Sequence, residues 1–575
     1  MDKKTVILII LLGLLVIFWM PIMTRLGLLK PAPQPIRQPG TEQPVQQAPA
    51  DTAQRPLLPE RQQVMPTRQD TAATLAAADT VIDIPEELIT VETGIWEITL
   101  TNHGGGPISF KLTDYKYEDG TPIQMLPDCE VATPSFTYLG GTLPGNSLAY
   151  RASRPAGRYT VTNTPLELTY TYEKEGGGAI SKRYRFYPDR YDYDLILEIS
   201  DRPGLGFERN YIIEWNNRLG PTELNIGDDY NAMWAMAYQG GEHYKFDDFN
   251  NNILNENVPG NTGWIANRSK YFTAILIPRS QPGEAAQAYG VREKIQSRQG
   301  AVTARAISTG ITMPLEYAPS ITDSFSVFVG PIDYGVLSKY NNEIVDLIDI
   351  GTTPFVGWII RIFAVPIMWL LPRMYDIIPN YGLVIIIFSL LIKVVTFPLT
   401  KKTLKSMLGM RELQPKMEEL KKKHKNNPQA LNREMMKLYK EMGINPLSGC
   451  LPMLPQMPLF FALFSVFRST ILLRQAPFIL WWNDLSRGAL SLTDPYMILV
   501  ILMVGLMFLQ QKTGMTDPKN KALTYIFPLM LGFFFYKASA GLVLYWTCFS
   551  LFSFIEQIVY KRPMMEKAEA QKQTA

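Results

Sequence analysis

The chain has 575 residues and a formal net charge of +3 at pH 7, so two or more domains are expected and nucleic acid is not expected as a specific partner. Its three cysteines and three histidines are widely separated, which argues against a disulfide framework and against a histidine-based metal or catalytic site. Apolar residues are concentrated at the extreme N-terminus and after about residue 350, on either side of a polar block. This segregation indicates a membrane protein that carries a globular domain.

The N-terminal residues 1–24 are predicted to form a signal-anchor helix. Their apolar run, VILIILLGLLVIFWMPIM, is long enough to span a bilayer, and Lys3 and Lys4 precede it. A cleaved signal peptide is the alternative, but no clear small-x-small cleavage site follows the run. Residues 25–79 are rich in Pro, Gln, Ala and Thr, and this composition predicts a flexible tether.

Residues 80–345 are predicted to form a large β-sandwich domain. Segments such as GIWEITLTNHGGG and YDYDLILEI alternate polar and apolar residues between Gly, Pro and Asp breakers. Few helical patterns interrupt them, so we expect an all-β domain. Two roles stay open for it: its sheet edges bind peptide, or the domain is a folded spacer.

The topology of the membrane part follows from one basic loop. Residues 401–442 hold many lysines and arginines and few acids, and the positive-inside rule places such a loop in the cytoplasm. Two spans before the loop achieve this from a cytoplasmic N-terminus, whereas three do not. We therefore expect residues 350–379 to form an interfacial amphipathic helix on the outer face, with Arg361 and Arg373 near the headgroups. A tilted or re-entrant segment is the alternative.

Residues 380–562 are predicted to form a five-helix core, and residues 563–575 a cytoplasmic tail. After the basic loop, apolar runs occupy about 447–467, 496–509, 523–536 and 540–558. With the run at 383–395 and the N-terminal anchor, they give about six transmembrane helices and cytoplasmic termini. The runs at 496 and 523 are short for a hydrocarbon core of ~30 Å.

The basic loop itself is predicted to be an antiparallel helical hairpin. Leucines and methionines recur at spacings of three and four on both sides of a break at 425–429. The methionines that we single out are Met410, Met417, Met435 and Met442. They form the hairpin's own packing seam, or else an adaptable apolar surface for varied hydrophobic segments.

A lysine, Lys393, lies inside the apolar run that precedes the basic loop. Snorkelling to the headgroups is one interpretation. The other is a hydrophilic substrate groove that is open to the cytoplasm, in which water solvates the ammonium group because the apolar core of the spans holds no acidic partner; Glu556 is expected near the cytoplasmic end of the last span. The candidate groove residues are Lys393, Ser389, Gln456, Tyr545 and Trp546.

Four stretches resemble one known family. They are IIIFSLLIKVVTFPLTKKTLKSM, the segment from LQPKMEELKKKHKNNPQ to PLFFALFSVFR, LRQAPFILWWNDLS and SAGLVLYW. Together they resemble the YidC/Oxa1/Alb3 membrane protein insertases over about residues 350–562, and the anchor, tether and β domain are similar in layout to the Gram-negative type. The family usually carries an arginine at the position of Lys393, so the positive charge is kept and the planar fork is lost.

The resemblance implies a β-supersandwich in the periplasm and a groove that opens to the cytoplasm and to lipid. It implies a function without enzymatic catalysis, cofactor or metal: the insertion and folding of nascent inner-membrane proteins, alone or with the Sec translocon. Further implied partners are the lipid bilayer and, at the cytoplasmic face, a ribosome or targeting factors. The implied location is the bacterial inner membrane.

Two other classes of function are weighed against this one. A transporter or channel is expected to show inverted repeats or paired intramembrane charges, and the sequence shows neither. An enzyme, for example a sugar-modifying one, needs a convergent catalytic set, which the scarce histidines and cysteines disfavour.

Overall fold

The computed structural model describes residues 84–573 except 128, 130, 139–147, 176, 206–209, 298–299, 316–317, 341, 351–356, 426, 442–452 and 515–520. Only the backbone is described at 203–204, 342, 399, 402–412, 414, 428, 453–455, 513–514, 521–524 and 560–573. The predicted anchor, the tether and Met442 lie outside the described residues, and so does the side chain of Met410.

The polar block folds into two β-sheets. The smaller sheet has the strand order β4 (Pro122–Gln124), β3 (Gly106–Lys116), β2 (Trp96–Thr101), β1 (Leu88–Glu92), β7 (Gly157–Thr160). The larger has the order β5 (Ser135–Tyr138), β11 (Asn210–Trp215), β17 (Gly300–Pro314), β16 (Gly283–Ser297), β14 (Ile253–Arg268), β15 (Phe272–Pro278), β18 (Ile321–Pro331), β10 (Asp192–Ser200), β9 (Ala179–Phe186), β8 (Leu166–Glu173), β6 (Arg151–Ala152), with β12 (Trp234–Gln239) and β13 (Glu242–Phe246) joined through β14. Four short helical turns accompany them: α3 (Arg202–Leu205), α4 (Ile226–Asn231), α5 (Tyr334–Leu337) and η1 (Asn342–Ile348).

The two sheets pack face to face, because alternate residues of their strands are apolar and buried. Phe110 of the smaller sheet lies 6.0 Å from Tyr193 and 5.9 Å from Trp215 of the larger sheet, between ring centroids. Along β10, buried Tyr193, Leu195 and Leu197 alternate with half-buried residues. The predicted all-β sandwich is therefore confirmed.

The rest of the described chain is helical. Its elements are α6 (Gly357–Ile377), α7 (Tyr381–Lys423), α8 (Pro428–Glu441), α9 (Met453–Ser469), the short η3 (Ile471–Leu473), α10 (Met497–Gly514), α11 (Lys521–Phe535) and α12 (Ala540–Gln573). Within the described residues, the stretches 357–377, 381–398 and 540–559 are long and apolar enough to cross a membrane, and α10 and α11 contain shorter apolar stretches. Together with the sandwich, these helices confirm the predicted fold class, a polytopic α-helical membrane protein with a large all-β domain.

The helix boundaries differ from the apolar runs of the sequence. α10 has 18 residues, which corresponds to roughly 27 Å at 1.5 Å per residue and so nearly spans a bilayer core. α7 continues unbroken for 43 residues, from the apolar run into the basic segment. The side chain of Asn380 caps its start by accepting a hydrogen bond of 3.1 Å from the Leu383 backbone N–H.

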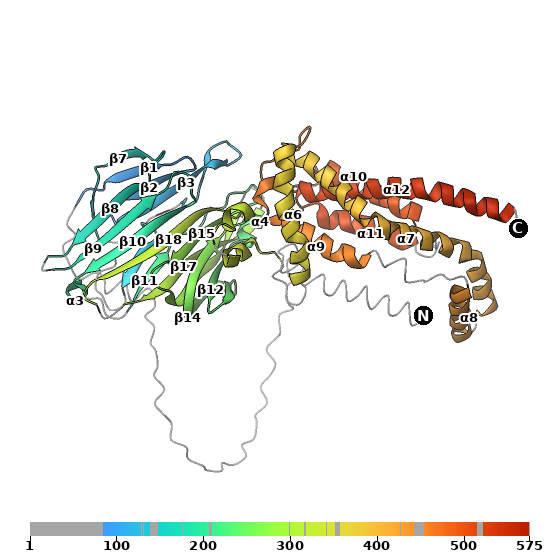
Figure 1. Cartoon of the computed structure of the whole chain (residues 1–575), viewed down its shortest axis with the longest axis horizontal. Helices are drawn as coiled ribbons and strands as arrows, with labels where there is room; N and C mark the ends of the chain where they lie inside the picture. The colour runs from blue at the N-terminus through green and yellow to red at the C-terminus, as the bar shows by residue number, and fades with distance from the viewer. Residues whose placement is uncertain are drawn as a thin grey trace, which may run out of the picture.

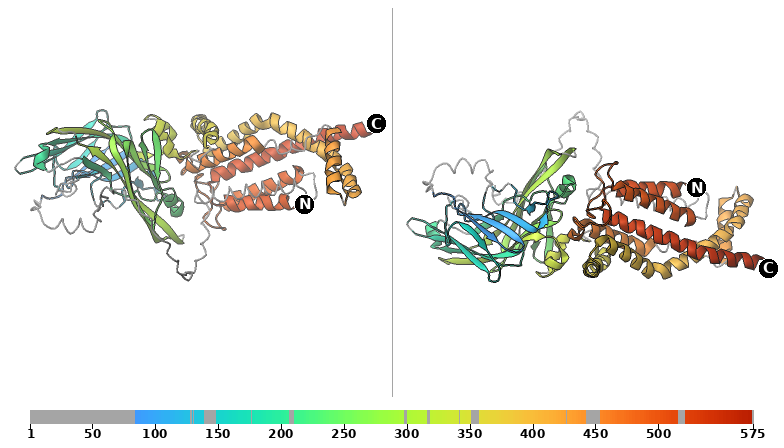
Figure 2. Two further views of the ribbon diagram at one scale, coloured as in Figure 1. Left: turned by 90° about the horizontal axis from the view of Figure 1, so that it is seen from below. Right: turned by 90° about the horizontal axis from the view of Figure 1, so that it is seen from above.

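The sandwich and α8 lie at opposite ends of the helical part (Figure 1). The views in Figure 1 and Figure 2 agree that α7, α10, α11 and α12 run along the long axis of the molecule, whereas α6 lies across that axis beside the sandwich. One continuous apolar core joins the two parts, since Trp264 and Phe328 of the sandwich, Leu347 of η1 and Ile367 of α6 belong to the same buried cluster.

Candidate functional site

Lys393 of α7 points into the interface between α7 and α12. Its Nζ donates a hydrogen bond of 2.9 Å to Ser553 Oγ and lies 2.5 Å from Glu556 Oε2. It also lies 5.0 Å from the ring centroid of Phe549, within cation–π range. The side chains of Lys393 and Glu556 are only 10% and 7% exposed. The ammonium group is therefore held by one helix, α12, through a hydroxyl, a carboxylate and an aromatic face.

This geometry corrects the expectation that Lys393 has no acidic partner and relies on water. Both Lys393 and Glu556 lie inside stretches that are long and apolar enough to cross a membrane, 381–398 and 540–559. The expectation was wrong because of the register in which α12 packs against α7. This register places Glu556, near the end of the apolar stretch of α12, beside Lys393. An ion pair also lowers the cost of placing each charge in a low-dielectric medium.

The pair is not saturated with hydrogen bonds. Neither carboxylate oxygen of Glu556 has a hydrogen-bond partner of acceptable geometry among the described side chains, although Oε2 is at ion-pair distance from the lysine. The side-chain oxygens of Gln557 on α12 and Gln511 on α10 are likewise buried without a hydrogen-bond partner among the described residues. Buried polar atoms of this kind normally bind water or a ligand.

Ser389 and Tyr545 lie close to this pair. Ser389 is one helical turn before Lys393, is fully buried, and donates a hydrogen bond of 2.7 Å to the Ile386 carbonyl of its own helix. The Tyr545 ring stacks on Phe549, the ring below the lysine, at 5.8 Å. These residues form one packed cluster, which we call the α7–α12 seam: Ser389, Lys393, Tyr545, Phe549, Ser553 and Glu556.

The two other candidate residues, Trp546 and Gln456, are not part of this cluster. Trp546 packs against Phe460 of α9 at 5.4 Å and against Phe535 of α11 at 6.5 Å. Gln456, on α9, is half-buried and is not among the residues that hold the Lys393 ammonium group. The seam thus contains Ser389, Lys393 and Tyr545 from the predicted set, and it adds Ser553 and Glu556. The spacing of Ser550, Ser553 and Glu556 by three residues marks one face of a helix and was the available sequence signal.

The hairpin consists of the end of α7, which stops at Lys423, and of α8, which begins at Pro428. The Tyr439 hydroxyl donates to Met417 Sδ at 3.7 Å, so Met417 packs within the hairpin. Met435 is half-buried, whereas its neighbour Met436 is 53% exposed. Met417 thus packs inside the hairpin, whereas Met436 exposes about half of its side chain.

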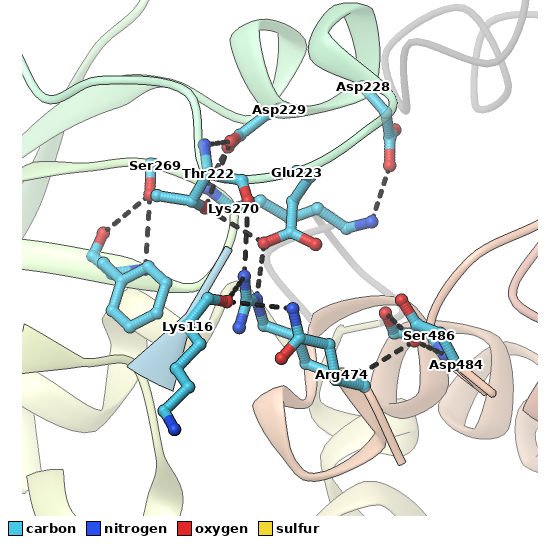
Figure 3. Close-up of polar contacts among 12 residues, drawn as sticks. Lys116, Thr222, Glu223, Asp228, Asp229, Ser269, Lys270, Arg474, Asp484 and Ser486 are labelled. Atoms are coloured by element: carbon cyan, nitrogen blue, oxygen red, sulfur yellow. Dashed lines mark hydrogen bonds and ion pairs between the residues drawn. The ribbon is translucent and has the colours of Figure 1, made fainter. Parts of the chain in front are cut away.

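A second polar cluster joins the sandwich to the loop after α9 (Figure 3). Arg474 Nε lies 2.6 Å from Glu223 Oε1, and Arg474 Nη2 donates to the Lys116 carbonyl at 2.9 Å. The Gln475 side-chain amide donates to the same carbonyl at 2.9 Å. The Arg474 side chain is only 3% exposed. These contacts fix the loop against the β domain.

Two neighbouring aspartates in this cluster have different electrostatics. Burial raises the pKa of Asp228, but Lys270, at 2.8 Å, and Arg468 outweigh it and lower this pKa to about 2. Burial raises the pKa of Asp229 to about 6, although its carboxylate accepts hydrogen bonds from the backbone N–H groups of Thr222 and Lys270. Asp228 is thus an ionic partner of Lys270 and Arg468, whereas Asp229 holds the backbone N–H groups of Thr222 and Lys270 by hydrogen bonds.

Within the described residues, no group of three or more His, Cys, Asp or Glu side chains is arranged to hold a metal ion. The two sites that stand out are therefore the buried ion pair of the seam and the cluster around Arg474.

The comparisons with known proteins place the chain in a family. A model described as "60Kd inner membrane protein" matches residues 373–568, and a model described as "YidC periplasmic domain" matches residues 88–370. The first model contains the α7–α12 seam, and the second contains the sandwich.

The relatives match along nearly the whole chain. "Membrane protein insertase YidC" of Prosthecochloris aestuarii is 33% identical and covers 96% of this chain and 93% of its own length. The protein of the same description from Chlorobaculum tepidum is 32% identical and covers 100% and 97%. A crystal structure described as "Active YidC insertase" with its first transmembrane domain resolved is 18% identical, with a TM-score of 0.36, and covers 85% and 96%. The chain belongs to the YidC family of membrane protein insertases.

Proposed function

We propose that this protein is a YidC-type insertase of the bacterial inner membrane, which inserts and helps to fold nascent inner-membrane proteins. The chain is 33% and 32% identical, along nearly its whole length, to two proteins described as membrane protein insertases, and this similarity supports the proposal. The most informative structural feature is the buried polar seam, because a lysine and a glutamate inside membrane-length helices are costly and mark functional sites.

The proposed orientation places the sandwich in the periplasm, with both termini and the hairpin in the cytoplasm. The basic composition of 401–442 supports it through the positive-inside rule. The position of α8 and the sandwich at opposite ends of the helices is consistent with it (Figure 1). Cysteine labelling tests the orientation: a cysteine at Lys437 should be labelled only from the cytoplasmic side, and labelling only from the periplasm would refute it.

We propose that α6 lies in the outer membrane interface, in agreement with the expectation for residues 350–379. Its orientation across the axes of α7 and α12 supports this (Figure 1). Trp358 and Trp369 are 66% and 50% exposed, and tryptophan is enriched at membrane interfaces. Arg373 lies 3.8 Å from the Trp369 ring centroid, so its charge shares that interfacial position.

In the proposed mechanism, the polar tail of a substrate passes the α7–α12 seam while its apolar segment remains at the lipid-facing side. The seam offers a cation, a carboxylate and hydroxyls, which replace part of the hydration of the tail. The apolar segment then moves into lipid, and burying its surface there is favourable by ~25 cal/mol per Å². The protein lowers the barrier by shortening the apolar path of the polar tail, without covalent chemistry.

The finer partners are proposals of the same kind. The positive charge of the hairpin and the partly exposed Met436 side chain are suited to a ribosome, a targeting factor or a nascent segment at the cytoplasmic face. Cooperation with the Sec translocon follows from the family alone.

Reconstitution of the purified full chain into liposomes tests the function. A single-span substrate with a short translocated tail should become protease-protected in these liposomes, and should stay accessible in liposomes without the protein. Equal protection in both would refute an insertase function. An ion-flux measurement on the same liposomes tests a channel instead.

A further inference from the structure

In the proposed mechanism Glu556 serves only as one polar group among several, yet it is also the direct ionic partner of Lys393. Its carboxylate lies 2.5 Å from the Lys393 ammonium group, and the two side chains are 7% and 10% exposed. The net charge of the pair is therefore zero. An isolated lysine at this position would attract any acidic group that reached it, whereas this lysine already has a buried counter-ion.

The carboxylate also has unused capacity to accept hydrogen bonds. An ionised carboxylate accepts up to about four hydrogen bonds, yet beyond the contact of Oε2 with Lys393, neither Glu556 oxygen has a hydrogen-bond partner among the described residues. The lysine, in contrast, keeps a neutral partner in Ser553 at 2.9 Å. Loss of the contact with Glu556 would thus leave Lys393 still hydrogen-bonded and free to pair with another anion.

We propose that Glu556 is a resident counter-ion that determines which tail charges the seam accepts. This inference rests on the proposed insertase function. An acidic side chain of a translocated tail must displace Glu556 from Lys393, whereas a neutral tail needs no displacement. A basic side chain finds an acceptor in Glu556. The seam should therefore favour neutral tails over acidic ones.

The physical reason is the cost of net charge in a poorly polarisable site. An anion that enters beside an intact Lys393–Glu556 pair leaves one uncompensated negative charge among buried groups. If Glu556 is made neutral, the same anion completes a pair with Lys393 instead. Removal of the glutamate charge should thus convert a seam that disfavours acidic tails into one that prefers them.

The experiment uses the purified full chain in liposomes and two matched single-span substrates. Their translocated tails have equal length and carry either aspartates or asparagines at the same positions. The measured quantity is the ratio of protease-protected acidic-tail to neutral-tail substrate. The variants are Glu556→Gln, the double variant Lys393→Gln with Glu556→Gln, and Glu293→Gln, which removes one carboxylate from an exposed position on β16.

We expect a ratio below one for the unmodified protein and for Glu293→Gln. Glu556→Gln should raise the ratio by about fivefold or more, as expected for an unscreened charge pair. The double variant, which has no charge in the seam and so no buried unpaired ion, should return the ratio toward one. It also serves as a folding control if Glu556→Gln alone is poorly stable.

Two results would overturn the inference. One is a ratio for Glu556→Gln equal to that of the unmodified protein, which would reduce the pair to a structural link between α7 and α12. The other is a double variant that keeps the raised ratio, which would show that Lys393 is not the attracting group. Failure of the unmodified protein to insert either substrate would instead refute the proposed function.

Discussion

Arg474 and Glu223 form a buried ion pair at 2.6 Å although 251 residues separate them in the sequence. The arginine lies in the loop after α9, and the glutamate lies in the β domain beside α4 (Figure 3). This contact means that the domain is docked on the membrane part and is not only tethered to it.

Loss of either partner should destabilise the junction. We expect Arg474→Ala and Glu223→Ala each to cost about 3–5 kcal/mol, because each leaves a buried charge without its partner. Thermal unfolding in detergent measures this cost. The control is Lys437→Ala on α8, whose pair with Glu434 is 68% and 41% exposed and should contribute only about 0–1 kcal/mol. An Arg474→Ala protein as stable as this control would contradict a buried junction.

Deletion of the β domain, residues 80–331, should leave insertion activity but lower stability. The motifs that resemble the family's insertase part lie after residue 350, whereas the deletion exposes Arg474 and removes its acceptors Glu223, Lys116 and Thr222. Adding Arg474→Gln to the deletion should restore part of the stability. The measurements are liposome insertion and melting temperature, and loss of insertion by a stable deletion protein would show that the domain takes part.

The hairpin deletion, about residues 405–440, should impair insertion while the spans stay embedded. The deleted segment begins inside α7, which runs unbroken to Lys423, so the linker must let the shortened α7 end after its apolar stretch. Carbonate extraction checks embedding, and the liposome assay checks insertion. Normal insertion by an embedded deletion protein would mean that the hairpin is only a connection.

Lys182 should make the stability of the β domain depend on pH. Its Nζ donates to the Gly104 carbonyl at 2.6 Å and lies 4.9 Å from the Phe136 ring centroid. Burial lowers its pKa from 10.5 to about 7. Below about pH 7 both states bind the proton, so the folded state bears the full cost of a buried charge. Between these two pKa values only the unfolded state binds it, so the free energy of unfolding should rise with pH by up to about 1.4 kcal/mol per unit.

Urea unfolding of the full chain in detergent, followed by tryptophan fluorescence, measures this slope. Lys182→Met should raise the free energy of unfolding at pH 6 and flatten the rise above pH 7. Lys111→Met, at a lysine whose side chain is 43% exposed on β3, should leave the slope unchanged. An equal slope in the unmodified and Lys182→Met proteins would contradict the role of the buried amine.

The stability and the insertion activity of Lys393 variants should depend on the charge that residue 393 places opposite Glu556. Lys393→Arg keeps a cation within reach of the carboxylate, so insertion should be retained. Lys393→Met leaves Glu556 as a buried unpaired charge, with a cost of about 3–5 kcal/mol. Lys393→Glu places two carboxylates opposite each other and should be the least stable. Melting temperatures and liposome insertion test this order, and equal stability of all three variants would show that the lysine lies in water at the headgroups.

Local patterns in the chain are sufficient to predict the class of fold and the order of its parts. Alternation in segments such as YDYDLILEI predicts strands because one face of each strand must be buried, and the basic segment after Lys393 predicts the side of the membrane because lysines and arginines are retained in the cytoplasm. The break near residue 425 follows from local composition. All of these signals act within a few residues of the chain.

Which distant residues come into contact is seen only in the folded molecule. Ser553 lies 160 residues after Lys393 and still accepts its hydrogen bond, and Glu556, expected near the membrane surface, is the buried partner of the same lysine. The parallel pairing of β1 with β7 is likewise a long-range contact. Such pairings depend on the register in which helices and strands pack, and this register is set by the fit of many side chains together. No local pattern in the sequence records it, so the charge balance of the seam became visible only in the fold.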